Sequence, residues 1–144
     1  MVCLQKCETD RQRFGEDSVE RMIMYLTEYL EMSSFRTPPY VLDLGTGNGH
    51  LLFALLEAKN QLSKGALDAK KLCGIDYSQA SIQLAKSIAA KRGADCSHVV
   101  FEEADLREMI CVNNLREKAN EGHGWDIVCD KGTVSYTSVS YTHL

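Results

Sequence analysis

A glycine-rich segment is the part of the sequence whose residue types are best suited to bind a small ligand. Residues 45–49 read Gly-Thr-Gly-Asn-Gly and directly follow the apolar run 40–44. Because glycine has no side chain, the backbone of such a turn can approach a bound molecule closely. The apolar residues of 51–58 predict a helix that begins here and directs free backbone N–H groups at the same place. We therefore expect a ligand-binding turn between a strand and a helix.

Four aspartates add polar chemistry to this turn. Asp43, Asp76, Asp105 and Asp130 each lie at or just beyond the end of a predicted strand. In an open parallel sheet these ends share one edge, where ligands bind. Asp76 could accept hydrogen bonds from a ribose diol, or it could serve as an acidic residue before a helix N-terminus. Asp105 could bind the exocyclic amine of adenine, or it could cap the next helix.

The glycine spacing and Asp43 indicate the chemistry of the ligand. A dinucleotide-binding turn has the spacing G-x-G-x-x-G, whereas the third glycine of residues 45–49 comes one residue early. A carboxylate immediately before the turn would repel a pyrophosphate but would suit a cationic amine. The sequence therefore favours a ligand with an ammonium and a carboxylate group. An NAD-binding domain stays open as an alternative.

Local patterns predict that strands and helices alternate along the chain. The expected strands are residues 40–44, 72–76, 98–101 and 126–130. The expected helices are residues 17–30, 51–58, 79–92 and 106–119. This alternation predicts an α/β fold with a parallel sheet and helices on both of its faces.

The composition is that of one globular domain. Of the 144 residues, 44% are hydrophobic and 25% are charged, and 16 basic against 20 acidic residues give a net charge of −4. These values exclude a disordered chain and a basic nucleic-acid binder, and no apolar run is long enough to span a membrane. The first residues lack the apolar core of a signal peptide, so we expect a soluble, cytoplasmic protein. The six cysteines are scattered, which predicts reduced thiols and no metal site.

Three segments carry a resemblance to a known enzyme class. Residues 41–49, 74–78 and 104–106 resemble motif I, the ribose-binding segment and the adenine-binding segment of the class I S-adenosylmethionine-dependent methyltransferases, which have a Rossmann-like fold. Residues 14–18, 47–52 and 126–133 narrow the resemblance to the eukaryotic, fungal-type protein-lysine methyltransferases that modify translation elongation factor 1-alpha. The resemblance covers about residues 14–133.

The resemblance implies a cofactor, a substrate and a set of site residues. The cofactor would be S-adenosyl-L-methionine, and the partner would be elongation factor 1-alpha, with no nucleic acid and no membrane involved. The implied cofactor-binding residues are Phe14, Gly15, Asp43, Gly45, Gly47, Asn48, Gly49, Asp76, Tyr77, Asp105 and Leu106. The implied catalytic residues, near the sulfonium and the incoming lysine, are Asp130, Lys131 and Gly132. Asp130 has two readings, as a general base or as a structural acid at a strand end. We expect a monomer.

The two ends of the sequence depart from this family. Residues 1–13 resemble nothing in it, residues 14–133 form the cofactor-binding domain, and residues 134–144 are a polar tail. The family continues with a further helix and further strands, so the sequence predicts a truncated fold without its C-terminal strands. In such a fold the strand 126–130 would present an exposed apolar edge, and the chain would be marginally folded and inactive. A noncatalytic cofactor-binding fragment is therefore the alternative function.

Overall fold

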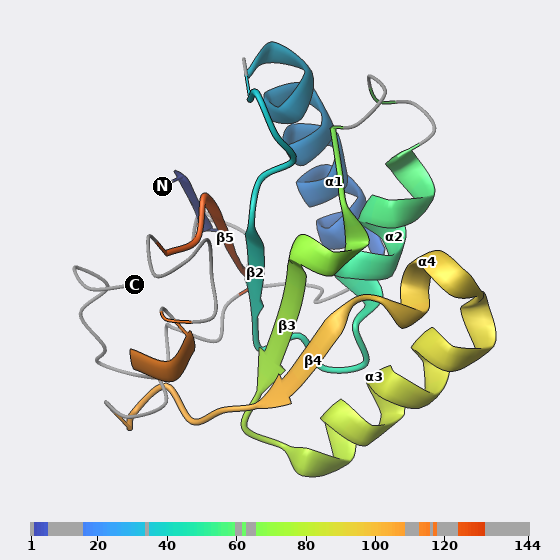
Figure 1. Ribbon diagram of the computed structural model, residues 1–144, viewed down its shortest axis with the longest axis vertical. Coiled ribbons are helices and arrows are strands. Elements are labelled where there is room, and N and C mark those ends of the chain that lie inside the picture. Colours follow the sequence, from blue (N-terminus) through green and yellow to red (C-terminus); the bar gives the residue numbers. More distant parts are fainter. Residues whose placement is uncertain are drawn as a thin grey trace.

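The computed structural model describes residues 2–5, 16–33, 35–59, 62, 66–108, 113–115, 117 and 124–131, and its five strands form one parallel sheet (Figure 1). The strands are β1 (Val2–Gln5), β2 (Val41–Leu44), β3 (Leu72–Asp76), β4 (Val100–Glu103) and β5 (Ile127–Asp130). The helices among these residues are α1 (Glu16–Met32), α2 (His50–Ala58), α3 (Gln79–Arg92) and α4 (Ala94–Ser97), with a 3-10 turn, η2, at Ala69–Lys71. The predicted α/β class is confirmed.

The order of the strands reverses beside β2. The sheet runs β1-β5-β2-β3-β4, so β3 and β4 follow β2 on one side while β5 pairs with its other side. Open α/β sheets bind ligands in the crevice that forms outside the carboxyl ends of the strands at such a reversal. Leu44 lies opposite Asp130 in the register of β2 and β5, so the carboxyl ends of these two strands coincide there.

Helices α1 to α4 pack in the core of one face of the sheet. Right-handed crossovers keep successive connections on the same face as long as the chain proceeds in one direction across the sheet, as it does from β2 to β4. Figure 1 shows α2, α3 and α4 together on the right of the strands. The core on this face includes Leu26, Val41, Leu52, Leu55, Leu72, Ile82, Ala85, Cys96, Phe101, Ile127 and Cys129.

The opposite face packs against the connection from β4 to β5, which returns across the sheet. Alternate residues of β2, β3 and β5 point to this face, because successive side chains of a strand alternate between its two faces. The second core contains Leu42, Leu44, Cys73, Ile75, Ala104, Leu106, Leu115, Trp125 and Val128. Trp125 also contacts Tyr40 edge to face, with 6.3 Å between the ring centroids. Among the described residues, the returning connection therefore supplies the cover of this face.

Strand β5 lies inside the sheet, which corrects the prediction that residues 126–130 present an exposed apolar edge. All four residues of β5 are buried, and β1 pairs in parallel with its outer side. The start of β5 is held to β2, because the backbone N–H of Tyr40 donates to Asp126 Oδ2 at 2.8 Å. Strand β1 was not predicted, since four residues without a clear alternation carry no local signal for a partner so distant in the sequence.

Two other predictions about the elements are wrong in their bounds. Strand β4 begins at Val100, two residues later than expected, and the helix expected from residue 106 does not begin there. Residues 106–108 form a turn instead, in which the N–H of Glu108 donates to the carbonyl of Asp105 at 3.0 Å. Helical backbone follows at 113–115.

The described part of the chain also bears on cysteine chemistry and on membranes. Cys73, Cys96 and Cys129 are buried as reduced thiols, as the sequence predicts for these three positions. Within the described ranges, no helix is long and apolar enough to cross a membrane.

Candidate functional site

The glycine segment forms a tight turn between β2 and α2. Gly45, Gly47 and Gly49 have φ angles of 63°, 57° and 81°, in the left-handed region that glycine enters without the steric cost that a side chain imposes. The N–H of Gly49 donates to the carbonyl of Thr46 at 3.0 Å, and the N–H of Phe53 donates to the carbonyl of Gly49 at 3.1 Å. The turn thus leads directly into the first turn of α2.

Gly47 and Gly49 have different surroundings within this turn. A Cβ atom on Gly49 would lie 2.7 Å from Phe101 Cζ and 2.8 Å from Phe53 Cε2, whereas a Cβ atom on Gly47 would meet nothing within 4 Å. Gly49 therefore permits the close packing of the turn on the core. Gly47 faces open space, which makes it the glycine whose backbone a ligand can approach.

Gly74 in β3 is a further glycine that positions the turn. A Cβ atom there would lie 2.5 Å from Thr46 Oγ1 and 2.9 Å from Phe101, so any side chain would push the turn away from β3. The N–H of Thr46 also donates to the carbonyl of Ile75 at 2.8 Å. No individual role was predicted for Gly74, although a glycine inside a strand often marks the close approach of another backbone.

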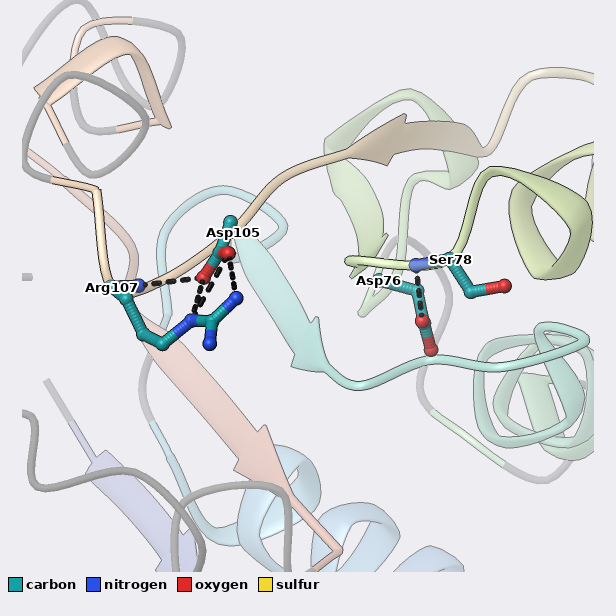
Figure 2. A network of polar contacts seen from close by, with 4 residues as sticks. All are labelled: Asp76, Ser78, Asp105 and Arg107. Carbon is teal, nitrogen blue, oxygen red and sulfur yellow. Dashed lines mark hydrogen bonds and ion pairs between the residues drawn. The ribbon is translucent and has the colours of Figure 1, made fainter.

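Asp76 joins the glycine turn to the start of α3. Its Oδ2 accepts a hydrogen bond from the N–H of Gly47 at 3.0 Å, and its Oδ1 accepts one from the N–H of Ser78 at 2.9 Å, the second of which is drawn in Figure 2. The Ser78 hydroxyl in turn caps α3 by accepting from the N–H of Ser81 at 3.3 Å. Because an ionised carboxylate has about four lone-pair sites, Asp76 keeps capacity for further donors.

Asp105 follows β4 and is paired with Arg107 (Figure 2). Its Oδ1 accepts from the backbone N–H of Arg107 at 3.0 Å and from Nε at 2.9 Å, and its Oδ2 contacts the guanidinium as well. These hydrogen bonds from Arg107 lower the pKa of Asp105 from 3.8 to about 2. The neighbouring Leu106 is buried, whereas Tyr77, beyond β3, is 74% exposed. A ligand that approaches Asp105 must therefore share this carboxylate with a guanidinium.

Replacing Arg107 with alanine is expected to raise the pKa of Asp105 from about 2 toward 3.8. The cause is the loss of the guanidinium hydrogen bonds, which stabilise the charged carboxylate. A depressed pKa stabilises the fold above the unfolded value of 3.8 and loses this contribution as the pH falls toward 2. Carbon-13 NMR titration of the Asp105 carboxyl measures the shift, with Arg92→Ala, which breaks the exposed pair with Glu57, as the control. An unchanged Asp105 titration in Arg107→Ala would contradict the pairing.

Asp43 forms a buried ion pair with Lys131 across the reversal of the strand order. The side chain of Asp43 is fully buried, and Lys131 Nζ lies 2.7 Å from its Oδ1 and 3.0 Å from its Oδ2. The Thr46 hydroxyl donates to Oδ2 at 2.8 Å. Burial raises the pKa of Asp43 above 3.8, while Lys131 acts in the opposite direction and the nearby Asp130 adds to the rise.

The remaining predicted residues divide into those that the structure places and those outside the described residues. Asp130 is buried at the end of β5. Asn48 is exposed and accepts a hydrogen bond from the N–H of His50 at 3.2 Å, at the start of α2. Phe14, Gly15 and Gly132 lie outside the described residues. In the described part of the chain, no group of three or more His, Cys, Asp or Glu residues is arranged to hold a metal ion.

Comparisons with known proteins agree on one family. The chain matches the family described as "Methyltransferase domain" over residues 40–139. It is 39% identical over 132 residues to protein-lysine N-methyltransferase efm4 of Schizosaccharomyces pombe. The matched region covers 88% of this chain and 50% of that protein. It is 32% identical to human EEF1A lysine methyltransferase 2, over 88% of this chain and 44% of that protein. The chain thus spans about half the length of the curated relatives it matches.

The fold also has a counterpart among solved structures. The small RNA methyltransferase HEN1 superposes with a TM-score of 0.51 at 20% identity, covering 86% of this chain and 14% of that one. At this identity the likeness concerns the fold alone.

Proposed function

The chain belongs to the methyltransferase domain family, and from this premise we propose that it transfers a methyl group from S-adenosyl-L-methionine to a lysine of translation elongation factor 1-alpha. The observation that carries the cofactor assignment is the hydrogen bond of Asp76 to the backbone of Gly47, which joins the open glycine turn to an acid with spare acceptor sites. The names of the relatives support the lysine and the elongation factor as the acceptor.

We assign each part of this cofactor to residues near the glycine turn and the strand ends. The backbone at Gly47 borders open space and would accommodate the methionine part, together with Gly45 and Asn48. Asp76 would accept hydrogen bonds from the ribose hydroxyls. The exposed ring of Tyr77 would cover the adenine. We assign the edge of the adenine to Asp105 and Leu106, and closure of the site to Phe14 and Gly15.

The reaction requires little covalent chemistry from the protein. The bound cofactor would supply a methyl group on a cationic sulfonium. The lysine nitrogen would form a bond to the methyl carbon in line with the C–S bond that breaks, so that S-adenosylhomocysteine leaves and the amine gives up a proton. The protein must hold the acceptor lysine in line with the C–S bond of the cofactor. It must also favour the neutral amine, because a free lysine side chain has a pKa of about 10.4 and is charged at neutral pH. Asp130 and Lys131 stand at the end of β5, beside the end of β2 and its glycine turn. We propose that they border the acceptor amine together with Gly132.

The proposal extends to the oligomeric state, the compartment and the class of substrate. We propose a monomer that acts in the cytoplasm on a protein substrate and not on nucleic acid. The net charge of −4 supports this choice, because nucleic-acid binders carry basic patches.

Calorimetric titration of S-adenosylhomocysteine into the 144-residue chain tests the cofactor assignment. We expect saturable binding, and a loss of affinity of about tenfold or more in Asp76→Ala, because hydrogen bonds to a charged acceptor are lost. Asp68→Ala is the matched control, since Asp68 accepts from the N–H two residues ahead, as Asp76 does, but at η2. Equal affinity in Asp76→Ala and the wild type would contradict the ribose role.

Transfer of labelled methyl to purified elongation factor 1-alpha tests the catalytic part of the proposal. Incorporation that depends on Asp76 supports a lysine methyltransferase. Binding of S-adenosylhomocysteine without any incorporation would instead support the noncatalytic alternative. Binding of NAD in place of S-adenosylhomocysteine would support a dinucleotide domain.

A further inference from the structure

We propose that Lys131 is a resident cation on Asp43, which the α-ammonium group of the cofactor replaces when the cofactor binds. This inference rests on the proposed function, since it concerns how the methionine end of S-adenosylmethionine reaches its acid. It makes Lys131 a positioning residue whose side chain must move before Asp43 can contact the cofactor.

Burial is the first observation that requires an exchange. The carboxylate of Asp43 exposes no surface, whereas the Lys131 side chain that is paired with it is 23% exposed. The Thr46 hydroxyl and Lys131 Nζ together occupy both lone-pair sites of Oδ2, and Lys131 Nζ also contacts Oδ1. One lone-pair site remains on Oδ1, but because the carboxylate exposes no surface, a donor from solvent reaches it only when a neighbouring group moves. Lys131, which is partly exposed, is the group that we expect to move.

Charge balance is the second observation. Asp130 lies close enough to Asp43 to interact with it electrostatically, so two carboxylates share the carboxyl ends of β2 and β5. A buried carboxylate that loses its cation is strongly unfavourable unless another cation takes its place. Replacing one ammonium group by another keeps the charge of the site constant through the binding step. The exchange is consequently possible at a modest cost.

The location of the free space is the third observation. Thr46 contacts Asp43 through its hydroxyl, and the next residue, Gly47, faces open space. A ligand on the backbone of Gly47 would thus stand one residue beyond Thr46, whose hydroxyl contacts the acid that is paired with Lys131. The resident cation and the incoming one would compete for the same carboxylate.

The test compares two ligands that differ in the ammonium group alone. S-adenosylhomocysteine and its analogue with hydrogen in place of the amino group are titrated into the wild type, Lys131→Met and Lys71→Met. Lys71 is a matched lysine, since its Nζ donates to the carbonyl of Pro38 at 2.8 Å, away from Asp43. In Lys131→Met the preference for S-adenosylhomocysteine over the analogue should rise about tenfold or more, because a charge-assisted contact forms without a competitor. Lys71→Met should keep the wild-type preference.

A second measurement covers the case in which Lys131→Met does not fold. In wild-type protein with nitrogen-15 lysine, the Nζ resonance of Lys131 should shift on addition of S-adenosylhomocysteine and stay in place with the analogue. If the wild type binds S-adenosylhomocysteine, but Lys131→Met shows no increased preference and the Lys131 resonance of the wild type does not shift, the exchange is overturned and the proposed function stays intact. A wild type that binds neither ligand overturns the cofactor assignment, and the exchange with it.

Discussion

Replacing Lys131 with methionine is expected to lower the free energy of unfolding by about 3 kcal/mol at pH 8. The substitution leaves the fully buried carboxylate of Asp43 without its cation and beside Asp130. Burial already raises the pKa of Asp43 above 3.8, and loss of Lys131 raises it further. The folded variant therefore takes up a proton that the unfolded chain does not bind, so its deficit relative to the wild type should shrink as the pH falls from 8 toward 5.

Urea unfolding of both proteins at several pH values measures this deficit. Lys71→Met serves as the control, because it removes a lysine that contacts the Tyr40 ring and a carbonyl oxygen but no buried acid. Its deficit should be small and independent of pH. A Lys131→Met deficit that stays constant between pH 8 and pH 5 would show that Asp43 does not depend on this lysine.

Replacing Gly49 with alanine is expected to cost about 3 kcal/mol of stability, through two separate effects. A residue with a side chain at a φ of 81° is strained by about 1–2 kcal/mol. The added Cβ would also lie within 3 Å of the rings of Phe53 and Phe101, and overpacking of this kind costs about 1–3 kcal/mol. Thermal or urea unfolding of the variant measures the sum.

Two other glycines separate the strain from the crowding. Gly93→Ala, at a φ of 109°, and Gly47→Ala, at 57°, introduce a Cβ atom with nothing within 4 Å. Both should therefore cost only the strain, about 1–2 kcal/mol at Gly47 and about 1–3 kcal/mol at Gly93, whose ψ of −176° lies in a region that is almost restricted to glycine. If Gly49→Ala were no more destabilising than Gly47→Ala, the close packing of the turn on the core would be refuted. Gly47→Ala should in addition weaken the binding of S-adenosylhomocysteine, because the methyl group of the alanine enters the space assigned to the ligand.

The charged groups of the candidate site share one property that bears on ligand binding. Asp43, Asp76 and Asp105 already hold internal donors, namely the ammonium of Lys131, two backbone N–H groups and the guanidinium of Arg107. The donors of a ligand must share or displace these partners. The affinity for the ligand then depends on the difference between the hydrogen bonds to the ligand and the internal hydrogen bonds that it replaces. Side chains that never touch the ligand can therefore change this affinity.

Local sequence was sufficient for the parts of this protein that depend on neighbouring residues. The turn at 45–49 and the N-cap of α3 at Ser78 are confirmed, and so are three of the predicted strands within one residue of their bounds. These features follow from φ preferences, short-range hydrogen bonds and apolar runs, all of which are encoded within a few residues. The carboxylates at the strand ends were identified for the same reason.

Tertiary structure alone decided which of these segments meet. The order β1-β5-β2-β3-β4 places β5 between β2 and β1, so that both edges of β5 are paired. It also brings Lys131 into contact with Asp43, which is 88 residues away in the chain. The strict need for glycine at Gly74 likewise arises from Thr46 and Phe101, which approach it from other segments. Such contacts depend on how distant surfaces pack and how buried charges find partners, and no local pattern of residues contains that information.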